Sequence, residues 1–467
     1  MSDSLIVQLA RQITQNVEAI DQYHDAAGLR KHSFDIDTPP KYNYPPHIET
    51  ARQEVFAATT DLRDLVLGPV EALKIRSESY ADLVSLHVIY KFGIAESFPV
   101  GGEASFKDIA AVSGITEHNT SRLMRHGMLQ HMFKEVRPGI VAHTASTQAI
   151  AEDESVKDML GTNVDELWRS SPRVTDALQG WPTSKELSQT PYSIGTGTGA
   201  PFFAEMAKHP QRAQRFANAL RQYNPDHLTL RRTLVEAYDW AALGAATIVD
   251  LGAISGGLSI RLAELYPNLR FVVTNSSAML AQQYQQQQQQ QHQHGPSSPE
   301  HENNHNHETS PRPNGTTSTS TSPSTPNGTT SPPPQAVTDR ITWIPAPIFD
   351  TQPLLAHGAD IYYLRFHLHS CPDAYAVRLL HGLIPCLKPG ARLLLHDFVP
   401  TRWAGISAWE ERQMRIIDMQ QLIFLNSQTR SLAQWEALFA QADARFEFLG
   451  VTASRHGLDI FEVRWRG

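Results

Sequence analysis

The sequence predicts a chain of the α/β class, with a doubly wound, Rossmann-like domain at its C-terminal end and a winged-helix and helical domain before it. Residues 247–275 contain an apolar run, a glycine-bearing loop, an amphipathic segment and a second apolar run, which is the pattern of a β-α-β unit. Further strand-like runs then alternate with helical segments and end in two closing strands. A helix–turn–helix–hairpin pattern within residues 71–151 predicts the winged helix.

The composition excludes several classes of function. The 467 residues carry a net charge of −8, which offers no basic face in bulk for nucleic acid. No apolar run approaches the roughly 20 residues that a membrane span needs. The N-terminal residues show no cleavage-site pattern, and two cysteines cannot make a disulfide framework. We therefore expect a cytoplasmic protein that binds neither nucleic acid nor a membrane.

Residues 1–60 are predicted to form a helical arm, because apolar side chains recur there at helical spacing before two proline pairs interrupt the pattern. Such an arm rarely makes a core alone, so we expect it to pack on another domain or on a second copy of the chain. Residues 1–100 also hold more apolar helical surface than one small domain can bury. We therefore expect a homodimer.

Residues 61–155 are predicted to form a winged-helix-like dimerisation domain. A helix is expected from Phe106 to Val112, a turn at Ser113-Gly114, and a second helix with its cap near Thr116. Arg122 and Arg125 on the second helix would suit DNA binding. Methionines and a histidine interleave with these arginines and no basic wing follows, so the pattern favours a domain that does not bind DNA.

Residues 156–240 are predicted to be a helical connector that contributes to a substrate pocket. An apolar stripe there includes Phe202, Phe203 and Met206. At helical spacing such a stripe is more typical of a core than of a pocket, and both interpretations stay open at this point.

Residues 241–467 are predicted to form the Rossmann-like domain, with an insertion at 282–335 of Gln, His, Ser, Thr and Pro. That composition cannot bury enough apolar surface to offset the entropy of ordering, which predicts a disordered insertion between two parts of one sheet. We expect no specific metal site from its histidines, because they lack an ordered scaffold. A helix is expected over Asp373–Leu387.

The glycine-bearing loop after the first predicted strand holds Gly252 and Gly256. Glycines let a ligand approach the backbone, and the start of the following helix favours negative charge. The loop therefore predicts a ligand site, with a tight turn in an unliganded domain as the alternative.

Several sequence words together resemble fungal O-methyltransferases that use S-adenosylmethionine, the class I branch related to plant caffeate-type enzymes. These words are SFKDIAAVSGI, GIVAHTAST, FAEMAKHPQRAQRFANAL, YDWAALG, YLRFHLHSCPDAYAVRLL, LKPGARLLLHDFVP and RSLAQWEALF. The resemblance covers nearly the whole chain except 282–335. It implies S-adenosylmethionine as cofactor, held by Asp250, Gly252, Ser255, Gly256 and Asn275.

Three departures from the family pattern concern this cofactor. Ala253 and Ile254 stand where the family has glycines, Asn275 replaces the acid that binds the ribose, and Pro347 replaces an aspartate near the adenine. They leave the affinity for the cofactor open.

The resemblance also implies catalytic residues. His369 occupies the position of the family's general base, although the family word His-Asp-Trp is here His369-Ser370-Cys371 and a glutamate is replaced by Thr429. Asp397 is the residue expected to orient His369. A satisfied histidine at a strand end is the structural alternative.

Because several methyl-transfer features are altered together, we favour the pericyclase branch of this family, which cyclises polyketide or pyridone intermediates. There the resemblance assigns substrate hydrogen bonds to His143 and Arg365. The alternatives are a working O-methyltransferase with His369 as base, acting on a phenolic or enolic polyketide, and a catalytically inactive binding protein. In each case the expected partner is a small polyketide-type molecule.

Overall fold

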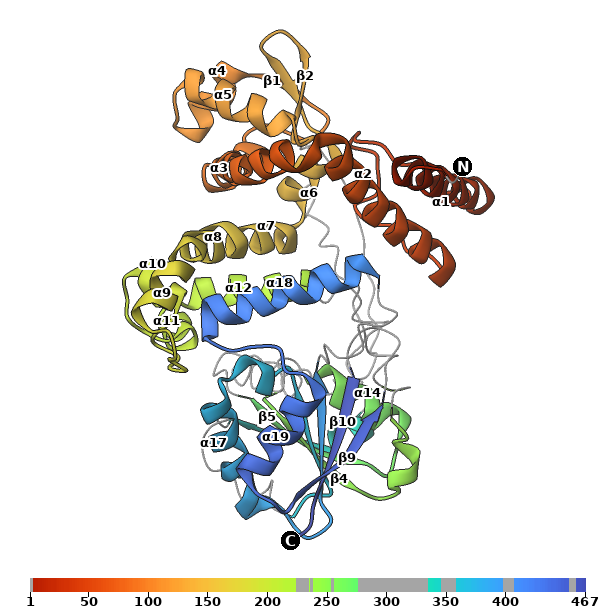
Figure 1. The fold of residues 1–467 in the computed structure, drawn as a ribbon, viewed down its shortest axis with the longest axis vertical. Coiled ribbons are helices and arrows are strands. Elements are labelled where there is room, and N and C mark those ends of the chain that lie inside the picture. Colours follow the sequence, from red (N-terminus) through yellow and green to blue (C-terminus); the bar gives the residue numbers. More distant parts are fainter. Residues whose placement is uncertain are drawn as a thin grey trace, which may run out of the picture.

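A computed structural model describes residues 3–223, 235, 238–252, 256–275, 335–345, 358–397, 407–452 and 459–467. The helices α1 to α3 and the winged helix lie at one end, a layer of helices lies in the middle, and an α/β sheet lies at the other end (Figure 1). The predicted insertion at 282–335 lies outside the described residues apart from its last position.

The N-terminal arm consists of α1 (Leu5–Ala27), which packs on the first half of α2 (Pro46–Glu78). Ile20, Ile48 and Ala51 form the small core between them. Within α2, Gly68 adopts φ 73° and Pro69 follows, so the helix is kinked there. In Figure 1 both helices extend to one side of the molecule, and α2 also contacts α18.

The winged helix is confirmed. Its elements are α3 (Tyr80–Lys91), β1 (Glu103–Ser105), α4 (Phe106–Ser113), α5 (Glu117–Met128), β2 (Lys134–Arg137) and β3 (Ile140–Ala142), with strand order β1-β3-β2. Gly114 ends α4 at φ 75°, and the Thr116 side chain accepts a hydrogen bond from the Asn119 backbone as an N-cap, as the sequence predicted.

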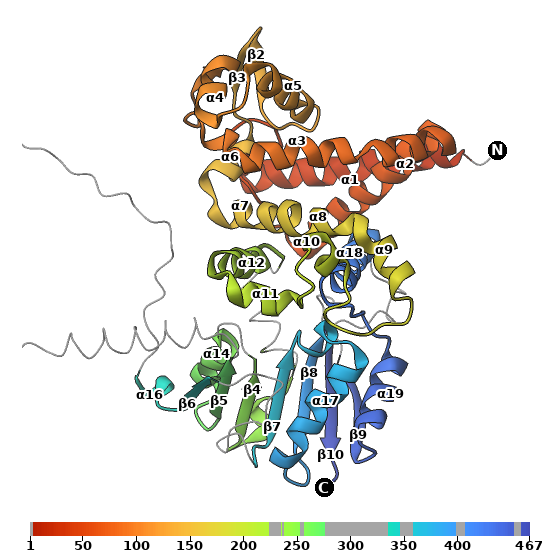
Figure 2. The same cartoon turned by 90° about the vertical axis from the view of Figure 1, so that its left-hand side faces the viewer.

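The middle layer holds α6 (Ala145–Glu152), α7 (Glu154–Gly161), a π-helical turn η2 (Thr162–Leu167), α8 (Trp168–Ser170), α9 (Val174–Gly180), α10 (Pro191–Thr196), α11 (Phe202–Lys208) and α12 (Pro210–Tyr223). A helix from the last part of the chain, α18 (Ala408–Leu425), lies in the same layer and contacts α10 (Figures 1 and 2). Because of α18, the connector and the α/β domain share a core.

The sheet has the order β6-β5-β4-β7-β8-β10-β9. Its strands are β4 (Thr247–Leu251), β5 (Arg270–Asn275), β6 (Ile341–Pro345), β7 (Ile361–Arg365), β8 (Arg392–Asp397), β9 (Phe446–Thr452) and β10 (Asp459–Trp465). All pairs are parallel except those of β10, which runs antiparallel to both neighbours. The predicted doubly wound α/β class is thus confirmed, and β5 pairs with β6 although the insertion separates them in sequence.

Helices cover both faces of this sheet. On one face α17 (Asp373–Leu383) and α19 (Leu432–Ala442) bury Leu379 and Trp435 against the strands. On the other, α14 (Gly257–Leu265) and α16 (Gln335–Thr338) bury Leu262 and Val337. This double cover explains why the central strands are continuous apolar runs. The helix expected over 373–387 ends earlier, at Leu383, and a 3-10 turn follows because Pro385 cannot continue the helix.

Among the described residues, no helix has the length and apolarity needed to cross a bilayer.

Candidate functional site

His369 and Asp397 form a buried pair at the carboxyl edge of the sheet. His369 lies in a 3-10 turn, η6 (Leu368–Ser370), after β7, and Asp397 is the last residue of β8. The His369 Nδ1 atom lies 2.6 Å from Asp397 Oδ1, and both side chains are less than a tenth exposed. Parallel neighbouring strands end at the same edge, which brings together two residues 28 positions apart.

The contact fixes which histidine nitrogen carries the basic lone pair. An ionised carboxylate only accepts hydrogen bonds, so Nδ1 donates its proton to Asp397. In the neutral imidazole, Nε2 then carries the basic lone pair. This is the arrangement of an oriented general base.

The backbone before this turn is unusual. Phe366, directly after β7, adopts φ 56°, a left-handed conformation that costs energy for a bulky residue. Its ring lies edge-on to His369 at 5.3 Å between centroids. Such strain collects at functional sites because the surrounding structure must hold it.

Arg365 ends β7 beside the same turn. Its guanidinium carbon lies 5.0 Å from the centre of the Phe366 ring, and its buried Nε finds no hydrogen-bond partner among the described residues. Burial lowers the pKa of Arg365, and Tyr363 and Asp250 partly offset that effect. A buried donor without a partner is suited to a substrate oxygen.

His143 lies elsewhere, in the core of the winged helix. Its Nε2 donates to the Phe98 carbonyl at 3.2 Å, and its Nδ1 lies 3.1 Å from Thr147 Oγ1. Phe98 and Phe133 pack against its ring, and burial lowers its pKa. Within the described part of the chain, all these contacts are with residues 98–147, so the structure does not bring His143 together with Arg365 or His369.

The glycine-bearing loop follows β4. Asp250, the next-to-last residue of β4, is buried, accepts a 2.6 Å hydrogen bond from Ser259 Oγ, and has its pKa raised to about 6 by burial. Gly252 adopts φ 68°, and its N–H donates to Thr274 Oγ1 at 3.2 Å. Gly256 adopts φ 60°, and a Cβ there would lie 2.1 Å from the Trp343 ring, so packing alone requires this glycine.

Two of the five proposed cofactor residues lie wholly or partly outside the described residues. Ser255 lies outside them, as does Pro347. Asn275 ends β5, where its backbone pairs with Pro345, and its side chain is likewise outside the described part.

His367 joins the loop to the η6 turn, which the sequence did not predict. Its Nε2 donates to the Gly252 carbonyl at 2.8 Å, and burial lowers its pKa to about 4, so it is neutral at pH 7. The only sequence signal was its position two residues before His369. Sequence reasoning also missed Ser427 and gave no role to Arg430, both of which bond the η6 turn.

The apolar stripe of the connector divides into two parts. Phe202 and Met206 are buried in a cluster with Tyr192 and the end of α18, including Phe424. Phe203 is 55% exposed. The structure therefore places Phe202 and Met206 in a core between the connector and the C-terminal domain.

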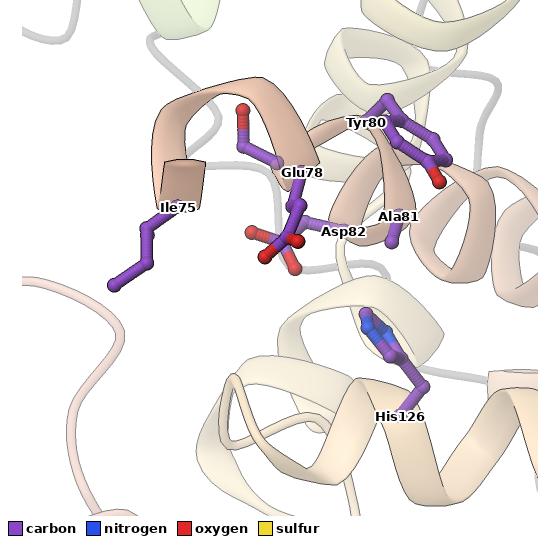
Figure 3. A pocket seen from close by; sticks show the side chains of 7 residues that line it. Ile75, Glu78, Tyr80, Ala81, Asp82 and His126 are labelled. Atoms are coloured by element: carbon purple, nitrogen blue, oxygen red, sulfur yellow. The ribbon is translucent and has the colours of Figure 1, made fainter. Parts of the chain in front are cut away.

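A hollow of about 420 Å³ opens at the junction of α2 and α3 (Figure 3). It lies far along the chain from His369 and Asp397. Glu78, Asp82 and His126 line it together with Ile75, Ser79, Tyr80 and Ala81. Asp82 already accepts from Gln130, and His126 Nδ1 lies 2.8 Å from Ser85 Oγ. Within the described ranges, no group of three or more His, Cys, Asp or Glu side chains could hold a metal ion.

Comparison with characterised proteins gives consistent relatives, although no family model matches the chain. The chain is 28% identical over 465 residues to the grayanic acid biosynthesis cluster O-methyltransferase of Cladonia grayi, covering 99% of this chain and 88% of that protein. It is 28% identical over 461 residues to O-methyltransferase gsfB of Penicillium aethiopicum, covering 98% and 97%. The chlorophenol O-methyltransferase of Trichoderma longibrachiatum is 27% identical over 470 residues, covering 99% and 91%.

Solved structures share the fold. OxaC in complex with SAH and oxaline has a TM-score of 0.69 at 16% identity, over 99% of this chain and 100% of that one. A structure described as a pericyclic reaction enzyme has a TM-score of 0.63 at 18% identity, over 98% and 100%. The resemblance found in the sequence is thereby confirmed: along nearly its whole length, this chain is similar to the fungal class I O-methyltransferases.

Proposed function

We propose that the protein is an S-adenosylmethionine-dependent O-methyltransferase of fungal secondary metabolism that acts on a phenolic or enolic hydroxyl of a polyketide-type molecule. The observation that carries this proposal is the 2.6 Å contact between His369 and Asp397. The sequence alone favoured a pericyclase, because the partners expected to tune a base at 369 are replaced by Ser370 and Thr429. A close, buried Asp397 supplies such a partner from the neighbouring strand.

In this mechanism the substrate hydroxyl lies against His369 Nε2. His369 would accept the hydroxyl proton at Nε2, which would leave the substrate oxygen with a lone pair available to attack a methyl donor held at the glycine loop. Asp397 holds the imidazole in orientation and stabilises the imidazolium that forms. When bound, S-adenosylmethionine supplies the electrophilic methyl group.

The described part of the glycine loop fits this cofactor. Gly252 turns the chain at the end of β4 without a Cβ, which leaves room for a ligand at the carboxyl edge of the sheet. Asp250 is fixed by Ser259 below it. We propose Asp250, Gly252 and Gly256, with Ser255 and Asn275, as the residues that hold the cofactor. Because Asn275 lacks the charge of an acid, we expect weaker binding of the ribose hydroxyls.

The pericyclase remains the second candidate, and Arg365 is the observation that favours it. A cationic donor whose buried Nε has no partner among the described residues can polarise a carbonyl and stabilise a polar cyclisation transition state without proton transfer. The similarity of fold to a pericyclic reaction enzyme is compatible with this candidate. His143 counts against the pericyclase, because both of its ring nitrogens hydrogen-bond within the winged helix.

The two candidates predict opposite mutant hierarchies in an assay with methyl-labelled S-adenosylmethionine and a chlorophenol. For methyl transfer, His369→Ala and Asp397→Asn should lower kcat by about 100-fold or more, and Arg365→Met should mainly raise KM. His381→Ala is a matched control, because His381 lies on α17 and its Nε2 bonds the Ala442 carbonyl, away from the turn. Full turnover by His369→Ala would contradict the proposal. Unlabelled isomerised product from a polyketide quinone methide, with Arg365→Met inactive, would establish the pericyclase.

We further propose that the chain forms a homodimer through helices α1 and α2. A group of exposed apolar side chains lies on helices α1 and α2, at Leu5, Ile6, Leu65, Val66, Val70 and Leu73. Val70 is 78% exposed and Val66 68%. Apolar surface concentrated in this way marks an interface.

A further inference from the structure

We infer that Ser427 and Arg430 are positioning residues that hold the η6 turn so that His369 meets Asp397. The inference rests on the proposed role of His369 as the general base. It concerns the loop between α18 and α19, residues 426–431, from which neither side chain touches the reacting atoms.

Arg430 clamps the turn from both sides. Its Nη1 donates to the Leu368 carbonyl at 2.7 Å and its Nη2 to the Cys371 carbonyl at 2.5 Å. Its Nε donates to Asp373, the first residue of α17, at 2.8 Å. Arg430 is 1% exposed, and the Trp435 ring lies 5.1 Å from its guanidinium carbon.

Ser427 completes the clamp between these two points. Its Oγ donates to the His369 carbonyl at 2.5 Å. Three of the four consecutive carbonyls from 368 to 371 thus accept a side-chain hydrogen bond from one short loop. The backbone on both sides of the His369 side chain is fixed by donors that are themselves buried.

The η6 turn needs these hydrogen bonds because it is too short to hold its own conformation. It is one 3-10 turn of three residues, entered through the left-handed Phe366. A short 3-10 segment has poor hydrogen-bond geometry, and a strained residue persists only where its surroundings hold it. A displacement of about 1 Å in a catalytic group is enough to cost a large factor in rate.

The loop is in turn fixed to the connector. Asn426 ends α18 at φ 53°, and its Nδ2 donates to the Ser184 carbonyl at 2.9 Å. The Thr429 backbone N–H donates to Asp418 on α18 at 2.7 Å. The position of the base therefore depends on α18 and on residues 184–186, which connect α9 to α10.

The test compares two serines of the same loop. Ser427→Ala removes the bond to His369, whereas Ser431→Ala removes the N-cap of α19, where Ser431 accepts from the Gln434 backbone at 3.3 Å, and leaves the turn untouched. In the chlorophenol assay we expect Ser427→Ala to lower kcat about 10-fold with KM unchanged, and Ser431→Ala to keep kcat within about 2-fold. Ser427→Thr keeps a hydroxyl at this position, so we expect it to retain most of the wild-type kcat.

A second measurement needs no substrate. Amide hydrogen exchange in the peptide 367–371 should speed up in Ser427→Ala and Arg430→Lys and not in Ser431→Ala, at matched global stability. Unchanged exchange in both variants, or equal kcat in the two serine variants, would overturn the inference. If His369→Ala retains turnover while exchange changes as expected, the clamp stands and the proposed base is wrong.

Discussion

At the scale of single residues, Asp250 shows how burial sets a charge. Its carboxyl is enclosed at the end of β4, where it accepts a hydrogen bond from Ser259. Burial raises its pKa from 3.8 to about 6. Because the folded pKa lies above the unfolded one, the folded state binds the proton more tightly, and the associated stability is present below pH 4 and lost as the pH rises through 6.

We predict that Asp250→Asn removes this pH dependence. Relative to wild type, the free energy of unfolding should be unchanged near pH 3.5 and higher above pH 6.5, by up to about 3 kcal/mol, because no buried charge then forms. Urea unfolding across pH 3.5–8 measures it. Asp360→Asn is the control of opposite sign: burial acts to raise the Asp360 pKa, but hydrogen bonds from Lys388 and Thr247 outweigh it and lower the pKa. Loss of the Asp360 carboxylate charge should therefore destabilise the protein at neutral pH.

At the scale of elements, the contact between the glycine loop and β6 limits which side chain can stand at position 256. Gly256 has both a left-handed φ and the Trp343 ring at the place of a Cβ. Gly197 adopts φ 71° and ψ 12°, close to the φ 60° and ψ 10° of Gly256, and a Cβ added there would meet nothing within 4 Å among the described residues. The two glycines therefore separate backbone strain from a steric clash.

We predict that Gly256→Ala destabilises the protein by about 2–4 kcal/mol and Gly197→Ala by about 1 kcal/mol. The difference is the cost of moving Trp343. Melting temperature and urea midpoint give both values. Equal losses in the two variants would mean that the Trp343 ring moves aside at no cost.

At the scale of the whole molecule, helices α1 and α2 share the smallest hydrophobic core. It centres on Ile20, Ile48 and Ala51, while the second half of α2 presents Val66, Val70 and Leu73. A surface of this kind is expected to be covered by a second copy.

We predict a dimer by light scattering at micromolar concentration, and a monomer for Val70→Glu with Leu73→Glu, because two charges on each protomer would then be buried. Leu449→Glu is the control, since Leu449 is 42% exposed on β9, outside both the arm and the winged-helix domain. A monomeric mass for the wild type would refute the proposed interface.

The sequence by itself determined the local elements and the order of the fold. Period-two and period-3.6 patterns, the cap at Thr116 and the glycine at 114 act within a few residues, so strands such as β4 and the winged helix were predictable. It also identified His369 and Asp397 individually, because each follows or ends a strand in a recognisable word.

Only the tertiary structure decided how these residues meet. The pairing of β7 with β8 brings Asp397 to His369, and α18 turns the stripe at Phe202 into a core. Likewise, His143 contacts Phe98, 45 positions away, and Arg430 contacts Leu368, 62 positions away. Contacts across such separations depend on strand order and helix packing, which leave no periodic signal in the chain itself.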